Sequence, residues 1–215
     1  MITKRALLTG AASVAALAAT TSWRSVVSAE SAAASVTPFD AIVFNDRYAD
    51  ARAFAQSFAA QGTQTLPIGG DAGTLWYGTL RKRIAAGQTR LAGIGTYMDF
   101  FIFETLARDV DLKARFRGQH DCRGRRTLTH SLFSGECAPQ VARAVELAGA
   151  EWPAGLAAAL PRVGNSASRS YGVGSPPSLK AAAIVATSVE RSHDHPGLLV
   201  SWVLDSRVHS DRVPA

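Results

Sequence analysis

Three repeats of one pattern organise the first half of the chain: a short apolar run that ends in a turn, then a segment with helical spacing of apolar residues. The apolar runs span 39–44, 63–68 and 90–94, and the helical segments span about 51–59, 74–86 and 98–109. The third helical segment is apolar almost all round, which predicts deep burial. Consecutive strand–helix units join parallel strands through right-handed crossovers. The sequence therefore predicts an α/β fold whose first half is a parallel sheet.

The second half of the chain follows a different pattern. Residues 112–120 and 127–133 alternate apolar and polar side chains, which is typical of antiparallel strands. Two helices, a surface loop rich in Gly, Ser and Pro, and two final strands around a hairpin turn are predicted after them. The helices span 138–147 and 154–160, and the loop spans 164–177. The strands span 180–191 and 198–206, with the turn at 192–197 between them. The predicted fold class is an α/β three-layer sandwich, parallel in its first half and antiparallel in its C-terminal half.

The N-terminus has the composition of an export signal. Residues 1–5 include a Lys-Arg pair and no acid, and residues 6–22 are uncharged and rich in Ala, Leu, Val and Thr. This segment is too weakly hydrophobic for a membrane span, and small residues at 27–29 offer a cleavage site. We predict a leader at 1–29, a flexible mature N-terminus at 30–38 and a single α/β domain at 39–215. An N-terminal helix of a cytosolic protein is the alternative.

The leader resembles the twin-arginine translocation signal. Residues 3–9 follow its Ser/Thr-Arg-Arg-x-hydrophobic-Leu pattern except at Lys4, which stands where the first arginine belongs. An ordinary Sec signal is the alternative. Further along, segments 117–120 and 199–204 are similar to a group of exported bacterial proteins that carry twin-arginine leaders. This resemblance implies contact with the export machinery and a periplasmic location without a stable membrane span, and it implies no activity.

The net charge of the chain depends largely on the leader. The full chain has 23 basic and 17 acidic residues; Lys4, Arg5 and Arg24 belong to the leader, so 20 basic and 17 acidic residues remain and the net charge falls from +6 to +3. Arginines do cluster at 81–83 and 115–126, as on a solvated helix face and strand edge or on an anion-binding surface. Apart from Phe116, no aromatic residue interleaves these arginines to support base stacking, so we expect no nucleic-acid partner.

Cys122 and Cys137 are the only cysteines. An even number of cysteines in an oxidising compartment favours a disulfide between them. Two separate thiols are the first alternative. A metal site is the second, because His120, Asp121 and His130 lie nearby in sequence, although no Cys-x-x-Cys or His-x-x-x-His spacing is present.

The loops that follow the three predicted parallel strands form the candidate ligand site. In such sheets ligands bind outside the carboxyl ends of the strands, where helix N-termini favour negative charge. We expect a crevice for a small anionic or carboxylate ligand there. Its predicted ligand-binding residues are Asp46, Arg47, Gly69, Gly70, Asp71, Thr74, Thr96 and Tyr97. Tight turns at the glycines and helix capping by the acidic and hydroxyl residues are the alternative explanation.

Histidines supply the evidence for an enzyme. His193 and His195 fall on one side of an extended segment, and His120, His130 or His209 would add a third ligand for a divalent metal. No Gly-x-Ser-x-Gly nucleophile motif is present. The leading hypothesis is an exported periplasmic binding or accessory protein without a metal or other cofactor. The alternatives are a metal-dependent hydrolase that uses His and Asp residues and an assembly subunit for another exported enzyme.

Overall fold

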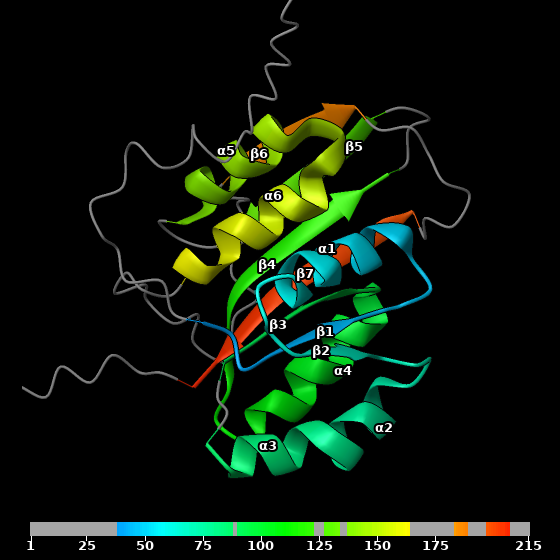
Figure 1. Ribbon diagram of the computed structural model, residues 1–215, viewed down its shortest axis with the longest axis vertical. Helices are drawn as coiled ribbons and strands as arrows, with labels where there is room; N and C mark the ends of the chain where they lie inside the picture. Colours follow the sequence, from blue (N-terminus) through cyan, green and yellow to red (C-terminus); the bar gives the residue numbers. More distant parts are fainter. Residues whose placement is uncertain are drawn as a thin grey trace, which may run out of the picture. The chain divides into compact units, whose positions relative to one another are not determined.

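The computed structural model describes residues 38–87, 90–122, 127–133, 137–163, 183–188 and 197–206. Its strands form one seven-stranded sheet (Figure 1). The strands are β1 (Ala41–Phe44), β2 (Thr65–Pro67), β3 (Arg90–Gly95), β4 (Lys113–Asp121), β5 (Thr127–Phe133), β6 (Ala183–Ser188) and β7 (Leu198–Asp205). The helices are α1 (Ala49–Ala59), α2 (Ala72–Leu75), the π-helical turn η2 (Trp76–Leu80), α3 (Arg81–Ala85), α4 (Tyr97–Arg108), α5 (Ala138–Ala148), η4 (Gly149–Glu151), α6 (Trp152–Ala159) and η5 (Leu160–Arg162).

The sheet has the strand order β2-β1-β3-β7-β4-β5-β6. β1 pairs in parallel with β2 and with β3. All other pairings in the sheet are antiparallel. The predicted change from parallel to antiparallel pairing is therefore confirmed, and it falls between β3 and β7.

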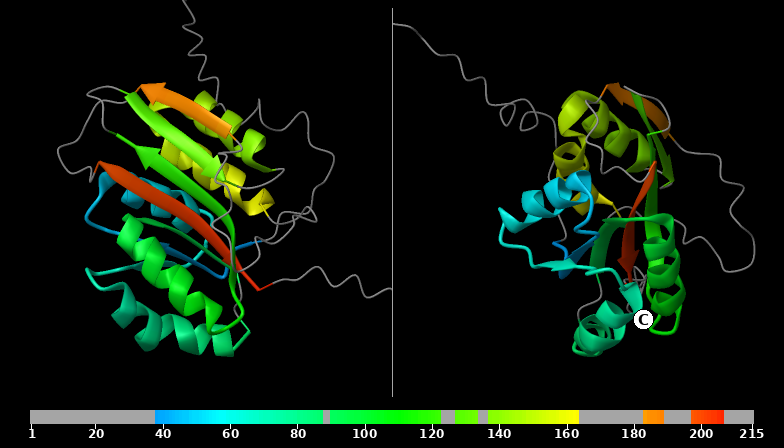
Figure 2. Two further views of the ribbon diagram at one scale, coloured as in Figure 1. Left: turned by 180° about the vertical axis from the view of Figure 1, so that it is seen from behind. Right: turned by 90° about the vertical axis from the view of Figure 1, so that its right-hand side faces the viewer.

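Alternate residues of the strands enter two hydrophobic cores on opposite faces of the sheet. In β1, Ile42 belongs to the core that α1, α5 and α6 share, and Val43 belongs to the core that α2, η2, α3 and α4 share. Figure 2 shows these two groups of helices on different sides of the strands. β7 contributes Val203 to the first core and Trp202 to the second. Strands in the middle of the sheet are therefore buried on both faces.

The first three helical segments lie close to their predicted positions. The second begins earlier than predicted, at Ala72, because Asp71 caps it. The third, α4, buries Phe100 and Phe103, but Met98 is 59% exposed and Phe101 is 49% exposed. The expectation of deep burial all round α4 was thus wrong, since only one side of this helix meets the sheet.

The predicted hairpin between the last two strands is wrong. β6 pairs with β5, whereas β7 pairs with β3 and β4, so two strands separate β6 from β7. The physical reason is the hydrophobicity of β7, in which every residue from Leu199 to Asp205 is buried. A strand that is apolar on both sides belongs in the interior of a sheet, while β6, with Ile184 65% exposed, lies at the edge.

The predicted Cys122–Cys137 disulfide is also wrong. Both cysteines are buried thiols and no bond joins them. Cys122 follows β4 at the end where the β4–β5 hairpin turns, whereas Cys137 follows the far end of β5, where Phe133 pairs with Arg117. Cys122 lies five positions after Arg117, a distance of about 17 Å along the sheet. The hairpin therefore keeps the two sulfur atoms at opposite ends.

Several predictions concern residues outside the described ranges. These are the predicted leader at 1–29, most of the mature N-terminus predicted at 30–38, the predicted surface loop at 164–177 and most of the turn predicted at 192–197. Among the described helices, none has the length and hydrophobicity of a membrane span.

Candidate functional site

The edge of the sheet at the carboxyl ends of β1, β2 and β3 is a topological switch point. From β1 the chain moves to β2 on one side, and from β2 it passes to β3 on the other side of β1. The connecting helix α1 packs in one core and α2 to α3 pack in the opposite one. In the register, Phe44 pairs with both Pro67 and Ile94, so the three strands end side by side. Such reversals of strand order are where open α/β sheets bind ligands.

The loop after β1 is held in place by the side chain of Asn45. Asn45 is 5% exposed; its Nδ2 donates to Asp99 Oδ2 at 2.8 Å, and its Oδ1 accepts from the Arg47 backbone N–H at 3.2 Å. The carbonyl oxygen of Asp46 accepts from Arg52 Nη1 at 2.6 Å. These bonds order the backbone on both sides of Arg47, and its side chain remains exposed. The cation therefore projects from a preorganised loop.

The start of α4 is closed by a capping box. The Thr96 backbone N–H and its Oγ1 donate to Asp99 Oδ2 at 2.8 and 2.9 Å, and the Asp99 backbone N–H donates to Thr96 Oγ1 at 3.1 Å. With Asn45, three donors thus converge on one oxygen of Asp99. A Cβ at Gly95 would come within 2.7 Å of that oxygen, so this position requires glycine. The polar atoms of Thr96 are consequently used within the protein.

The loop after β2 is a glycine turn followed by a second cap. Gly69 and Gly70 have φ values of 64° and 92°, a region that glycine enters without steric cost. The Asp71 carboxylate accepts from the Gly73 backbone N–H at 2.9 Å and from the Thr74 hydroxyl. Hydrogen bonds from Thr74 and Gly73 lower the pKa of Asp71 below its ordinary value. The Asp71 side chain is therefore a carboxylate engaged in capping.

The three predicted loops lie at one edge of the sheet. Some of their residues cap helices and others have exposed side chains. Thr96, Asp71 and Thr74 form caps, as the alternative explanation held. Arg47 and Tyr97 are exposed side chains at the same edge. Asp46, Gly69 and Gly70 are exposed as well. Together these exposed residues supply a cation, an aromatic ring, a carboxylate and glycine backbone at one edge of the sheet.

A buried chain of hydrogen bonds crosses β7, β4, β5 and β6. His120 Nδ1 lies 2.7 Å from His130 Nδ1, His120 Nε2 lies 2.8 Å from Ser201 Oγ, and His130 Nε2 lies 2.9 Å from Thr187 Oγ1. Both histidines are fully buried, and the Trp152 ring packs 4.4 Å from the His120 ring, between centroids. Register explains the contact between the histidines, because His120 and His130 are directly opposite in the β4–β5 pair.

The distance of 2.7 Å between the two Nδ1 atoms fits a hydrogen bond with one proton between them. With both rings neutral, one Nδ1–H donates to the other Nδ1, and the outer ring nitrogens bond to the two hydroxyls. Burial lowers the pKa of His130 to about 4, so its ring is neutral at pH 7. All four ring nitrogens are thus occupied by hydrogen bonds, which leaves none for a metal.

The described residues give no support to a histidine metal centre. Among them, no three His, Cys, Asp or Glu side chains lie close enough together to hold a metal ion. His193, His195 and His209 fall outside the described ranges. The expectation that His120 supplies a ligand is not met, because both of its nitrogens are bonded inside the sheet.

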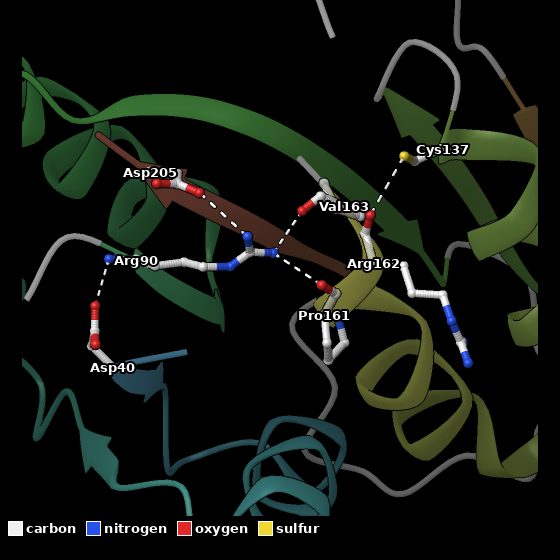
Figure 3. Close-up of polar contacts among 7 residues, drawn as sticks. All are labelled: Asp40, Arg90, Cys137, Pro161, Arg162, Val163 and Asp205. Carbon is white, nitrogen blue, oxygen red and sulfur yellow. Dashed lines mark hydrogen bonds and ion pairs between the residues drawn. The ribbon is translucent and has the colours of Figure 1, made fainter. Parts of the chain in front are cut away.

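A buried arginine joins distant parts of the chain at the other end of β3 (Figure 3). Arg90 is 1% exposed; its Nη2 donates to the carbonyl oxygens of Val163 at 2.6 Å and Pro161 at 3.2 Å, and its Nη1 lies 3.4 Å from Asp205 Oδ2. The Phe39 ring centroid lies 4.7 Å from the guanidinium carbon. Because every side of this group is covered by protein, it serves stability and not ligand binding.

Comparison with known protein families, with curated proteins and with solved structures finds no match for this chain.

Proposed function

We propose that this chain is an exported periplasmic binding or accessory protein that holds a small anionic ligand at the switch point. The observation that carries the proposal is the reversal of strand order at β1, which directs the loops after β1 and β3 to opposite faces. Ligands of open α/β sheets occupy this position. The exposed guanidinium of Arg47 stands there on a loop that Asn45 orders.

The charges at this edge restrict the class of ligand. Arg47 offers a charge-assisted hydrogen bond to a carboxylate. Asp46 and Asp71 are exposed acids at the same edge, and their carboxylates accept hydrogen bonds. A ligand that carries both a carboxylate and hydroxyl or amino donors satisfies both kinds of side chain, and the exposed Tyr97 ring offers an apolar contact. Hydroxy- and amino-carboxylates are therefore the proposed class.

We also propose how the whole chain is organised. Helices in both cores support a three-layer sandwich, and we infer one domain over residues 39–215. The basic head and weakly apolar segment of residues 1–29 support a cleaved leader and the periplasm.

The proposal is tested by calorimetric titration of the mature chain with a panel of hydroxy- and amino-carboxylates. Arg47→Ala should weaken binding of the acid that binds by about 1.5–3 kcal/mol, the range for a hydrogen bond to a charged group. Arg143→Ala is the matched control, because it removes the same charge from α5, where the side chain is 69% exposed and pairs with Glu146. Equal affinities in wild type and Arg47→Ala, or no binding across the panel, would contradict the proposal.

A further inference from the structure

Arg117 carries two buried hydrogen-bond donors that the described part of the chain leaves unpaired. These are Nε and Nη2 of its guanidinium. Arg117 lies in β4, on the sheet face where α4 packs, and pairs in register with Phe133 of β5 and Trp202 of β7. Buried donors in folded proteins nearly always have an acceptor, and an exception calls for an explanation such as a bound group.

Two aromatic rings contact the guanidinium without satisfying these donors. Its central carbon lies 4.9 Å from the Phe133 ring centroid and 5.8 Å from the Phe100 ring centroid. Aromatic faces attract the positive charge, so the rings hold the arginine in place. They provide no oxygen lone pair for an N–H group. The result is a fixed cation in which the N–H groups of Nε and Nη2 have no acceptor among the described residues.

The two unpaired atoms are adjacent on one edge of the guanidinium. Nε–H and Nη2–H point in the same direction from the planar group, and together they form the fork that binds both oxygens of a carboxylate. A single acceptor could bond to only one of these two N–H groups. The two unpaired donors therefore match an anion that offers two oxygens side by side.

The sheet face beside Arg117 carries Phe133 together with the polar side chains of Gln119 and Ser131, and no described helix covers it over β5 and β6. α4 packs on β3, β4 and β7, and α5 contacts β5 and β6 from the opposite core; Figure 2 shows no described helix over β5 and β6 on the α4 face. Asp99 marks the side of α4 that faces β1, through its bond to Asn45. Helical spacing places Phe101 on the other side, toward β4. It is 49% exposed.

We propose that this face binds a small carboxylic acid with an apolar body. The Nε and Nη2 atoms of Arg117 bind the carboxylate, and the rings of Phe133 and Phe101 contact the apolar part. Phe133 is half-buried and ends β5, and binding requires its ring to move away from the two nitrogen atoms. This site is separate from the switch point, because β3 and β7 lie between β1 and β4.

The experiment uses benzoate as the probe and benzamide as its neutral control. Benzoate is titrated into the ¹⁵N-labelled mature chain while the side-chain Nε–H signal of Arg117 is followed by NMR. We expect a saturable shift of that signal with benzoate and none with benzamide. Inorganic phosphate, titrated separately, shows whether the fork prefers a planar carboxylate, and stronger binding of phosphate than of benzoate would overturn the assigned ligand class.

Two variants test whether the fork of Arg117 binds the probe. Arg117→Lys keeps the charge but loses the fork, and it should weaken benzoate binding about tenfold or more. Arg143→Ala, which removes an exposed charge from α5, should leave the response of the Arg117 signal unchanged. The proposal is overturned if the Arg117 signal does not respond to benzoate, or if Arg117→Lys binds benzoate as tightly as the wild type. Because the wild-type signal is itself a readout, the result does not depend on the stability of Arg117→Lys.

Discussion

Acid should destabilise this protein through the buried His120–His130 pair. In the folded state the His130 ring is fully buried and its pKa is lowered to about 4, whereas the ordinary value is 6.5. Between these values the unfolded chain binds a proton at His130 that the folded chain does not. The contribution of His130 to stability is therefore complete above pH 6.5 and is lost as the pH falls toward 4.

The size of the effect follows from the difference between the two pKa values. One pKa unit corresponds to about 1.4 kcal/mol, so the free energy of unfolding should fall by about 3 kcal/mol across this window. The hydrogen-bond geometry gives the same direction, because a proton on each Nδ1 would place two donors 2.7 Å apart. Most of the loss should already be present at pH 4.5.

Urea unfolding at pH 8 and pH 4.5 measures this loss. The wild-type chain is compared with His130→Gln, in which the titrating ring is replaced by an amide. His130→Gln should be less stable at pH 8, and the difference in stability between the two pH values should shrink by about 2–3 kcal/mol. Carboxylates common to both chains cancel in this comparison. An equal pH dependence in the two chains would refute the assignment of a neutral buried His130.

Three further predictions concern packing and the thiols. Arg90→Met removes the buried cation of Figure 3 and leaves its carboxylate partner buried. Urea unfolding should therefore give a free energy of unfolding that is lower by about 3–5 kcal/mol. A change below about 1 kcal/mol would contradict a stabilising role of Arg90. Gly93→Ala places a Cβ 2.3 Å from an indole carbon and should cost at least roughly 1–3 kcal/mol, whereas Gly78→Ala, with no atom within 4 Å, should not lower the melting temperature. Cys122 and Cys137 should resist a thiol reagent in the folded protein and both react in urea without reductant; two unreactive cysteines in urea would mean a disulfide.

Local sequence signals predicted much of the fold. Short apolar runs and helical periodicity located the three strand–helix units, because each unit is formed by residues close in sequence. The place of β7 was missed because strand order is a non-local property. A short connection favoured a hairpin with β6, but the uninterrupted burial of Leu199 to Asp205 made an interior position more favourable. The apolar run itself was the available signal.

In the candidate site, too, local sequence predicted some features, and others depend on residues far apart in the chain. The capping roles of Asp71 and Thr96 follow from local patterns, and Thr96 with Asp99 three residues later is a capping box. The bond from Asn45 to Asp99 joins residues 54 apart in sequence, and no local pattern indicates it. The contact between His120 and His130 depends on the register of the β4–β5 hairpin, which turn length and side-chain alternation set together.

Backbone-amide NMR of the protein shows directly whether a ligand binds at the switch point. A hydroxy- or amino-carboxylate that binds by calorimetry is titrated into the labelled protein, and the perturbed amides are assigned. We predict that the largest changes fall in the loops that follow β1, β2 and β3, at residues 45–48, 69–74 and 96–98, and that Arg47→Ala diminishes them. Largest changes in α5 or α6, with these three loops unaffected, would contradict ligand binding at the switch point.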